Sequence, residues 1–481
     1  MPRRSAHRTW VGIAVVLCLA ASTCPSLLAS DLGSALLQLQ WSSYLGGLND
    51  DGAAGLAVDR DGNIFVVGNT SSPNFPPSAT TRRGTDIFVS KFTKLGGLVS
   101  TWYLGGSADD CALGCVLDRQ GNLLITGSTK SADFPTTKAY DRTYNGGGPS
   151  WGDVFVAKMS PSGKLLWSTY LGGSQEDYGW SIAADSFCNV YVTGMTKSSN
   201  FPTYKGYNRR YSGGTDAFVA KFISTGQLAW STYHGGGGED LGYGLVVDSA
   251  ANVYVTGRTT SMDFPTVGAF DPFHSGGTYD GYVSKLNCIG ALMWSTYIGG
   301  TGADCVEDVA CDNAGNIWLV GETNSADLPT SGAWDPGYNG GGDGFIVEMT
   351  CNGTLRQCTY IGGQDYDGLR SIAVDSLKNV YITGYTSAGD FPIVGGGDPV
   401  YHGGTLDVTL LKLNSAGALV FSSLLGGNGR DEERAIAIGC PGSICVVGGT
   451  TSTNFPTLAG WDRTFNGGTW DAFVSSFKSS R

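Results

Sequence analysis

The stretch Trp167–Thr203, WSTYLGGSQEDYGWSIAADSFCNVYVTGMTKSSNFPT, decides the fold because the chain repeats it. Nearly the same residues return from Trp230, as WSTYHGGGGEDLGYGLVVDSAANVYVTGRTTSMDFPT, and five looser copies occur elsewhere. Self-similarity at a fixed long period indicates a repeat architecture in which each copy forms one structural unit. The repeat therefore defines the architecture before any local pattern is considered.

A Gly-Gly pair marks each copy and gives the length of the unit. The first glycines of the pairs are Gly46, Gly105, Gly172, Gly235, Gly299, Gly362 and Gly426. Successive pairs are separated by 59, 67, 63, 64, 63 and 64 residues. Length varies only after a recurrent proline 30 residues beyond the first glycine, as expected for insertions in a surface loop. Seven copies thus extend from about residue 36 to the C-terminus, with no second domain between them.

Each copy contains four short runs that are typical of β-strands. Their β-branched and aromatic residues are bounded by Gly, Asp, Asn and Pro. In the third copy the runs are Trp180–Ala184, Val190–Thr193, Ala217–Phe222 and Leu228–Tyr233. Four antiparallel strands in each of seven units predict an all-β fold, a seven-bladed β-propeller. A β-helix or solenoid is the alternative.

The two ends of the repeat region favour the propeller over the solenoid. Residues Leu36–Leu45 match the fourth strand of a unit but precede the first complete one. The last unit stops after its third strand, Asp471–Phe477. We therefore predict that the N-terminal strand pairs with the last blade, because closing the ring removes free edge strands.

The N-terminus and the net charge indicate where the protein acts. Arg3, Arg4 and Arg8 precede the apolar run Val11–Ala21, and small residues follow it. This order is typical of a signal peptide, here residues 1–30, and the run is too short to span a bilayer. We expect residues 31–481 to form one propeller that is secreted or bound at the cell surface, without a transmembrane segment. A net charge of -12 argues against nucleic acid as a partner.

The cysteine count fits an exported protein. Ten cysteines remain after the signal peptide, and an even number in an exported chain suggests disulfides. Cys440 and Cys445 flank a turn and form the best local pair. The other pairings stay open. With only four histidines in the chain, a zinc site is not expected.

The combined phrase WSTYLGG…D…VD…NVYVTG.T…DFPT…GG.DAFVAK resembles the bacterial β-propeller repeat family known as SBBP repeats. The resemblance extends over all seven copies. It implies an exported or surface-associated bacterial protein with seven blades, and it implies no reaction and therefore no catalytic residues. The seventh copy departs from the pattern at Gly439 and Ser443, and the first is shortened after Pro76.

An aspartate follows five residues after the first glycine of every copy. These residues are Asp51, Asp110, Asp177, Asp240, Asp304, Asp367 and Asp431. A ring of carboxylates near one end of the propeller axis could bind Ca²⁺, which takes several oxygen ligands. Alternatively, each carboxylate caps its own turn. We favour the cap, because seven unneutralised carboxylates would repel one another. No cofactor other than Ca²⁺ is indicated.

A second aspartate recurs at the hairpin between the first two strands, and we interpret it as structural. It is found at Asp59, Asp118, Asp185, Asp248, Asp312 and Asp375.

Aromatic residues recur in the long loops, which we expect on one face. They are Tyr140, Tyr207, Phe270, Trp334 and Trp461, with Trp151 and Trp470 nearby. Such side chains could stack on a sugar ring or contact a protein partner. The alternative is that each ring packs its own loop onto its blade, which the recurrence favours.

The sequence predicts an exported binding or structural module, monomeric, whose ligand is an extracellular protein or a glycan. The alternative is a carbohydrate-active hydrolase or lyase with carboxylates at one end of the axis. The sequence does not decide whether the protein is an enzyme, although a non-catalytic role is favoured. A catalytic site should bring together two or three acids or histidines that do not recur, with perturbed pKa values.

Overall fold

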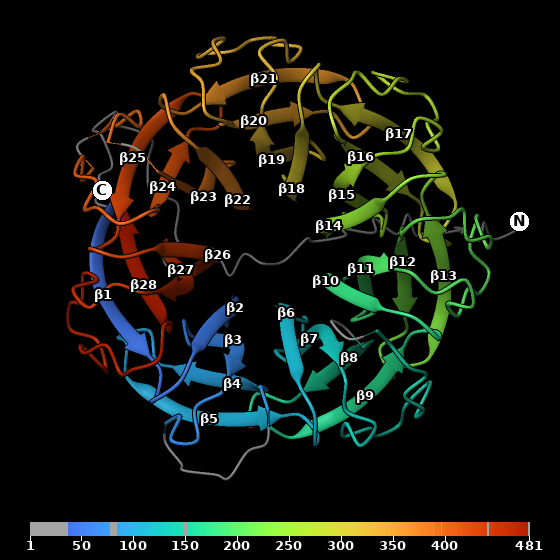
Figure 1. Ribbon diagram of the computed structural model, residues 1–481, viewed down its shortest axis with the longest axis horizontal. Coiled ribbons are helices and arrows are strands. Elements are labelled where there is room, and N and C mark those ends of the chain that lie inside the picture. Colours follow the sequence, from blue (N-terminus) through green and yellow to red (C-terminus); the bar gives the residue numbers. More distant parts are fainter. Residues whose placement is uncertain are drawn as a thin grey trace, which may run out of the picture.

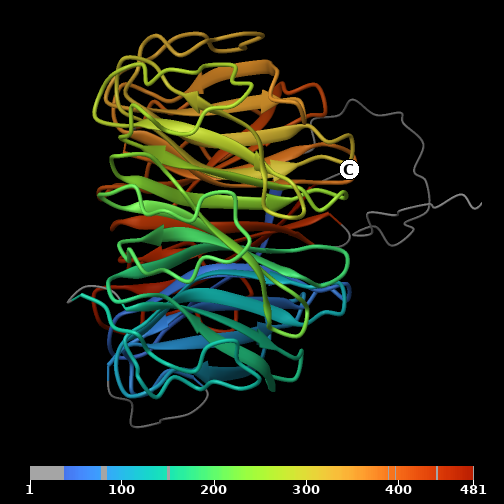
Figure 2. The ribbon, with the colours of Figure 1, turned by 90° about the vertical axis from the view of Figure 1, so that its right-hand side faces the viewer.

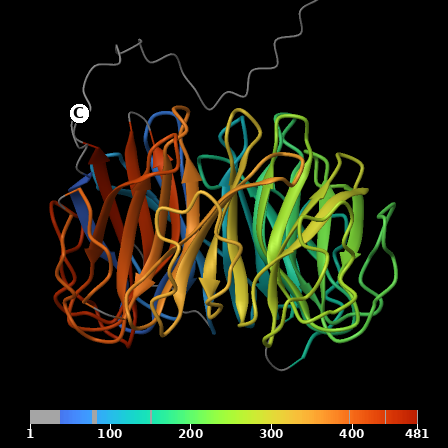
Figure 3. The ribbon, with the colours of Figure 1, turned by 90° about the horizontal axis from the view of Figure 1, so that it is seen from above.

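The computed structural model describes residues 37–76, 84–148, 152–387, 389–395, 397–439 and 442–479. Seven four-stranded antiparallel sheets surround a central axis (Figure 1). Seen from the side, the blades form a disc whose strands run from one face to the other (Figures 2 and 3). The predicted seven-bladed propeller is confirmed. The predicted signal peptide, Trp151 and Cys440 lie outside the described residues.

The strands take the same places in every blade. The inner strands are β2 (Asp51–Val58), β6 (Asp110–Leu117), β10 (Asp177–Ala184), β14 (Asp240–Val247), β18 (Asp304–Cys311), β22 (Asp367–Val374) and β26 (Asp431–Gly439). The second strands are β3 (Ile64–Thr70), β7 (Leu123–Thr129), β11 (Val190–Thr196), β15 (Val253–Thr259), β19 (Ile317–Thr323), β23 (Val380–Thr386) and β27 (Ser443–Thr450). The third strands are β4 (Asp86–Phe92), β8 (Asp153–Met159), β12 (Asp216–Phe222), β16 (Asp280–Leu286), β20 (Asp343–Met349), β24 (Asp407–Leu413) and β28 (Asp471–Ser479). The outer strands are β5 (Leu98–Leu104), β9 (Leu165–Leu171), β13 (Leu228–His234), β17 (Leu292–Ile298), β21 (Leu355–Ile361), β25 (Leu419–Leu425) and β1 (Leu37–Leu45).

The N-terminal strand closes the ring, as predicted. Strand β1 pairs antiparallel with β28 along its whole length and becomes the outer strand of the last blade. Its Trp41 side chain is buried, and the indole Nε1 donates a hydrogen bond to the Lys94 carbonyl of the first blade, 3.1 Å away. Trp167 makes the same bond to Ser224 of the next blade, also at 3.1 Å. The joint between the two chain ends is therefore built like the joints inside the chain.

The inner strands begin earlier than the sequence indicates. Strand β10 starts at Asp177, three residues before the predicted Trp180, because Asp177 already pairs with Thr196 of β11. The register shifts between Gly179 and Ser181, so Trp180 is the extra residue of a β-bulge. The sequence does not predict this part of the strand, because aspartate and glycine, here Asp177 and Gly179, are depleted in strands.

Long loops cover the outer strands. In the second blade, Thr137 of the loop forms an isolated bridge with Ser168 of β9, and Val267 and Ser331 do the same in two later blades. The buried Tyr170 anchors this loop from inside, because its hydroxyl donates to the Ser131 carbonyl at 2.6 Å. Backbone bonds from the loop protect a strand edge that would otherwise be free to pair with another chain.

No disulfide joins any two of the nine described cysteines. Cys445 is buried and its thiol lies 3.7 Å from Ser476 Oγ. Because Cys440 lies outside the described residues, its predicted pairing with Cys445 has no support here. The described residues also contain no helix with the length and apolar character needed to cross a membrane.

Candidate functional site at the upper mouth

The recurrent aspartates surround the end of the axis at which the inner strands begin, which we call the upper mouth. Each is almost fully buried. Asp177 Oδ2 accepts hydrogen bonds from the Gly173 amide at 2.7 Å and from Ser198 Oγ at 2.9 Å. The equivalent glycine amide donates in all seven copies, at 2.6–2.8 Å. This is the geometry of a turn cap.

No three His, Cys, Asp or Glu side chains among the described residues are grouped so that they could hold a metal ion. The hypothesis that the aspartate ring binds Ca²⁺ therefore stays a prediction, and we return to its test in the Discussion.

The recurrent aromatic residues do not come together. All five follow a loop residue that bridges to an outer strand, so each lies in a different blade around the rim. The Tyr207 hydroxyl contacts His234 Nδ1 at 2.6 Å, and Trp334 packs against a core cluster. Tyr140, Phe270 and Trp461 are each about 40% exposed. Of the two additional tryptophans, Trp151 lies outside the described residues, whereas Trp470 lines a cavity at the upper mouth.

The copies differ most at the bulge of the inner strand. Its extra residue is unpaired in all seven blades, and a bulge re-aims the side chain that it carries. The residues at this position are Ala54, Leu113, Trp180, Tyr243, Glu307, Arg370 and Arg434. Four neutral side chains are thus followed around the ring by three charged ones. The upper mouth therefore has two chemically different sides, although the backbone repeats seven times.

An aromatic arc occupies one side of the upper mouth. The Trp180 ring contacts the rings of Tyr178 and Tyr243 edge to face, with centroids 4.9 Å apart in both pairs. Leu113 and Leu241 belong to the same cluster. Edge-to-face pairs of this kind fix ring orientation and leave an apolar wall.

A charged arc lies on the other side and is centred on Glu432. This carboxylate lies 2.9 Å from Arg434 Nη2 and 3.6 Å from Arg370 Nη1, and it also pairs with Arg430. The Arg370 guanidinium stacks over the Tyr385 ring, 4.8 Å from its centroid. Arg370 thus contacts both a carboxylate and an aromatic ring, and Glu432 links the three arginines.

Acids complete the charged arc. Glu322 accepts hydrogen bonds from the hydroxyls of Tyr385 and Tyr366, the latter at 2.7 Å. The Cys305 thiol lies 3.2 Å from Glu307 Oε1. The two glutamates and the two tyrosines do not recur at the same positions in the other copies, whereas Cys305 corresponds to Cys111 of the second copy.

Burial and neighbouring charges shift the pKa values of the residues in the charged arc. Burial raises the pKa of Glu307, and the nearby Glu322 adds to this effect. Burial also raises the pKa of Glu433 to about 7, although Arg370 opposes the change. Burial and Arg370 lower the pKa of Arg434. Burial raises the pKa of Tyr178 in the aromatic arc, and the Arg434 charge opposes this change.

A cavity of about 340 Å³ opens beside the charged arc. Its lining includes Asp50, Asn69, Thr85, Glu432, Arg434 and Trp470. The small residues Gly52, Ala53 and Gly449 also line it and leave it open. An aromatic ring, a guanidinium and carboxylates thus converge on one hollow, which is the pattern of a small-molecule site.

Sequence reasoning did not identify these residues, apart from Trp470. The signal was nevertheless present, because the position eight residues after the first glycine differs in character from copy to copy. Recurrence in the sequence identifies the aspartates and the loop aromatics. Residues that recur in every blade serve folding, so this criterion passed over the residues that differ between blades.

Comparison with known proteins agrees with the repeat. The model of the beta-propeller repeat SBBP matches residues 40–76, 166–202, 229–265, 294–329 and 359–392. The SBBP beta-propeller repeat is thus found in five of the seven copies.

Two curated proteins resemble this chain. The regulatory protein FlaEY of Caulobacter vibrioides is 27% identical over 286 residues, which cover 54% of this chain and 28% of that protein. The uncharacterized WD repeat-containing protein L264 of Acanthamoeba polyphaga mimivirus is 22% identical over 507 residues, 85% of this chain and 36% of the relative. The chain thus spans about a third of the length of these relatives.

Among solved structures, the chain is similar to Sqt1 from Chaetomium thermophilum. The two share 10% sequence identity with a TM-score of 0.43, and the match covers 93% of this chain and 100% of Sqt1.

Proposed function

We propose that this protein is an exported binding module that acts at or outside the cell surface and binds a glycan at the upper mouth. Export rests on the predicted signal peptide at residues 1–30. The observation that carries the ligand class is the pairing of an aromatic wall around Trp180 with the guanidiniums of Arg370 and Arg434. Aromatic faces stack on the apolar faces of sugar rings, and charged groups make strong hydrogen bonds to polar substituents.

The cavity supports the same proposal. Its volume of about 340 Å³ is in the range of small-molecule sites, and Trp470 adds an aromatic side to a lining that also contains Asn69 and Glu432.

A glycan array probed with the protein tests the proposal, with and without Ca²⁺. Binding should fall at least about tenfold in Trp180→Ala and in Arg434→Ala, whereas Arg210→Ala, at an exposed arginine of an outer loop, should bind normally. Far-UV circular dichroism would confirm that each variant is folded. Failure of the parent protein to bind any glycan would refute the proposal, and so would equal binding by all three variants.

A carbohydrate-active hydrolase or lyase is the second candidate. Acids that do not recur, with raised pKa values, favour it, because a general acid near pH 7 needs such a shift. Glu433 is fully buried, so Glu307 is the acid better placed to contact a substrate. Turnover of a bound glycan that Glu307→Gln abolishes without loss of binding would support this candidate. Binding without turnover would reject it.

A further inference from the structure

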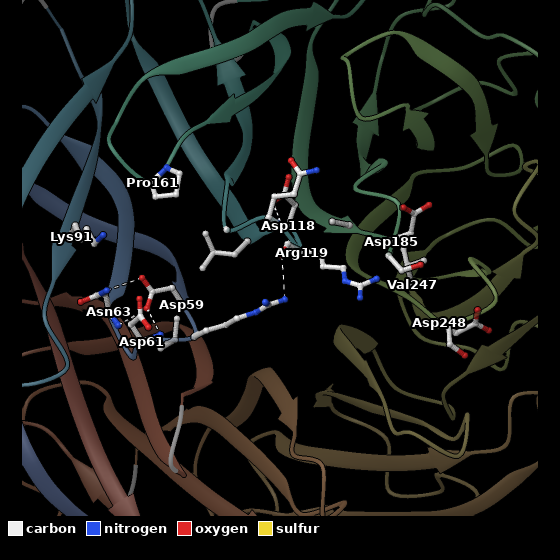
Figure 4. Close-up of a pocket in the computed structure, with 18 residues that line it drawn as sticks. Asp59, Asp61, Asn63, Lys91, Asp118, Arg119, Pro161, Asp185, Val247 and Asp248 are labelled. Atoms are coloured by element: carbon white, nitrogen blue, oxygen red, sulfur yellow. Dashed lines mark hydrogen bonds between the residues drawn. The ribbon is translucent and has the colours of Figure 1, made fainter. Parts of the chain in front are cut away.

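The opposite end of the axis, where the inner strands end in hairpins, carries a second cavity that we call the lower mouth. Its volume is about 580 Å³. The strand ends Val58, Leu117, Ala184 and Val247 form an apolar, half-buried floor. Four successive hairpins, those of the first to fourth blades, supply this floor (Figure 4). An apolar floor of this size is suited to a small molecule rather than to water alone.

Two arginines break the repeat at this mouth. Arg60 and Arg119 follow the hairpin aspartate in the first two blades, where the third and fourth blades have Ser186 and Ser249. Arg60 Nη2 donates a hydrogen bond to the Arg119 carbonyl, 3.3 Å away, which draws the two hairpins together. No described carboxylate forms an ion pair with either guanidinium.

Five aspartates line this mouth, and four of them, Asp59, Asp118, Asp185 and Asp248, already have partners. The fifth, Asp61, follows Arg60 in the chain and is exposed. Asp118 forms a buried ion pair with Lys158 at 2.7 Å, and Asp185 lies 3.9 Å from Lys221. Asp59 caps its own hairpin, because it accepts a bond from the Asn63 side-chain amide at 2.8 Å. Figure 4 shows the aspartates spread around the cavity, from Asp59 at the left to Asp248 at the right. Four of the acids are thus engaged by other groups, and Asp61 is exposed to solvent and forms no ion pair with either arginine, so both guanidiniums keep their capacity to bind an anion.

We propose that the lower mouth binds an amphiphilic carboxylate, a molecule whose apolar chain covers the floor and whose carboxylate pairs with Arg60 and Arg119. Guanidinium and carboxylate form charge-assisted bidentate bonds, so the anionic group supplies direction and the apolar chain supplies buried area. This site is independent of the glycan proposed for the upper mouth.

Titration calorimetry with octanoate tests the site, with octanol and octylammonium as comparison ligands of the same chain length. Octanoate should bind most tightly. The double variant Arg60→Ser/Arg119→Ser should weaken octanoate binding at least about tenfold. It should still fold, because serine occupies this turn position in other blades. The double variant with lysines should retain part of the affinity, since it keeps the charge but loses the bidentate geometry.

Arg434→Ala at the upper mouth is the matched control and should leave octanoate binding unchanged. The proposal is overturned if octanoate does not bind, if octanol binds as tightly as octanoate, or if the serine variant binds octanoate like the parent protein. Loss of octanoate binding in Arg434→Ala alone would move the site to the upper mouth and would also overturn it.

Discussion

Pairs of buried carboxylates between the blades should make this protein less stable as the pH rises. Asp153 at the start of β8 is fully buried, and burial raises its pKa to about 8, with a further contribution from Asp177 of the next blade. Both carboxylates face Gly172. A Cβ there would lie 2.7 Å from Asp153 Oδ1 and 2.8 Å from Asp177 Oδ2. Asp153 Oδ1 has no hydrogen-bond partner, so nothing in the joint compensates a negative charge on that oxygen.

The direction of the effect follows from proton binding. An aspartate in the unfolded chain loses its proton near pH 4, whereas folded Asp153 keeps it up to about pH 8. The stabilisation is therefore complete below pH 4 and is lost as the pH rises toward 8. Each retained proton changes the free energy of unfolding by about 1.4 kcal/mol per pH unit, so Asp153 alone accounts for roughly 3 kcal/mol between pH 5 and pH 7.

The same position is buried in the other blades, so the effect is multiplied. Burial raises the pKa values of Asp216, Asp280 and Asp471 to about 7 and those of Asp343 and Asp407 to about 6. The parent protein should thus lose several kcal/mol of stability between pH 5 and pH 8.

Asp153→Asn tests this reasoning, because asparagine keeps the shape and cannot ionise. Urea unfolding at pH 5, 6 and 7, followed by tryptophan fluorescence, should show a pH dependence reduced by about 1.4 kcal/mol per pH unit relative to the parent protein. The control is Asp133→Asn, at an exposed aspartate whose pKa hydrogen bonds from Ser107 lower. An unchanged slope in Asp153→Asn, or an equal reduction in the control, would refute the account of the joints.

Three further predictions follow from the fold. Gly172→Ala should destabilise the protein by about 2–4 kcal/mol, because the new Cβ would collide with two carboxylates. Gly52→Ala, with open space around its Cβ, is the control and should cost less than about 1 kcal/mol. Urea unfolding measures both free energies. Deletion of β1 (Leu37–Leu45) should leave the outer edge of β28 without a partner strand and cause self-association. Size-exclusion chromatography would then show larger species. A monomer of unchanged stability would contradict the role of β1 in ring closure. EDTA should not change the melting temperature of calcium-loaded protein, because protein donors already bond the ring aspartates such as Asp177; a drop would show that Ca²⁺ is bound.

The repeat made most of the fold predictable. Seven copies with fixed spacing determined the number of blades, and the extra strand before the first copy determined how the ring closes. Predictions for single elements were weaker at Asp177 and Gly179, because these residues are uncommon in strands and the bulge at Trp180 interrupts the alternation of side chains. The loop aromatics were found in the sequence, but their distribution around the rim depends on how each loop folds back onto its outer strand.

The sequence by itself determined that each blade must fold alike, because recurrent residues such as Asp177 and Gly172 serve turns and joints that every blade contains. Only the tertiary structure decided which residues meet at the two mouths. Trp180, Arg370 and Arg434 are far apart along the chain, and they come together because ring closure carries seven inner strands to one axis. Which residues lie near each other across that axis depends on ring closure, so it cannot be predicted from the residue spacing within one copy.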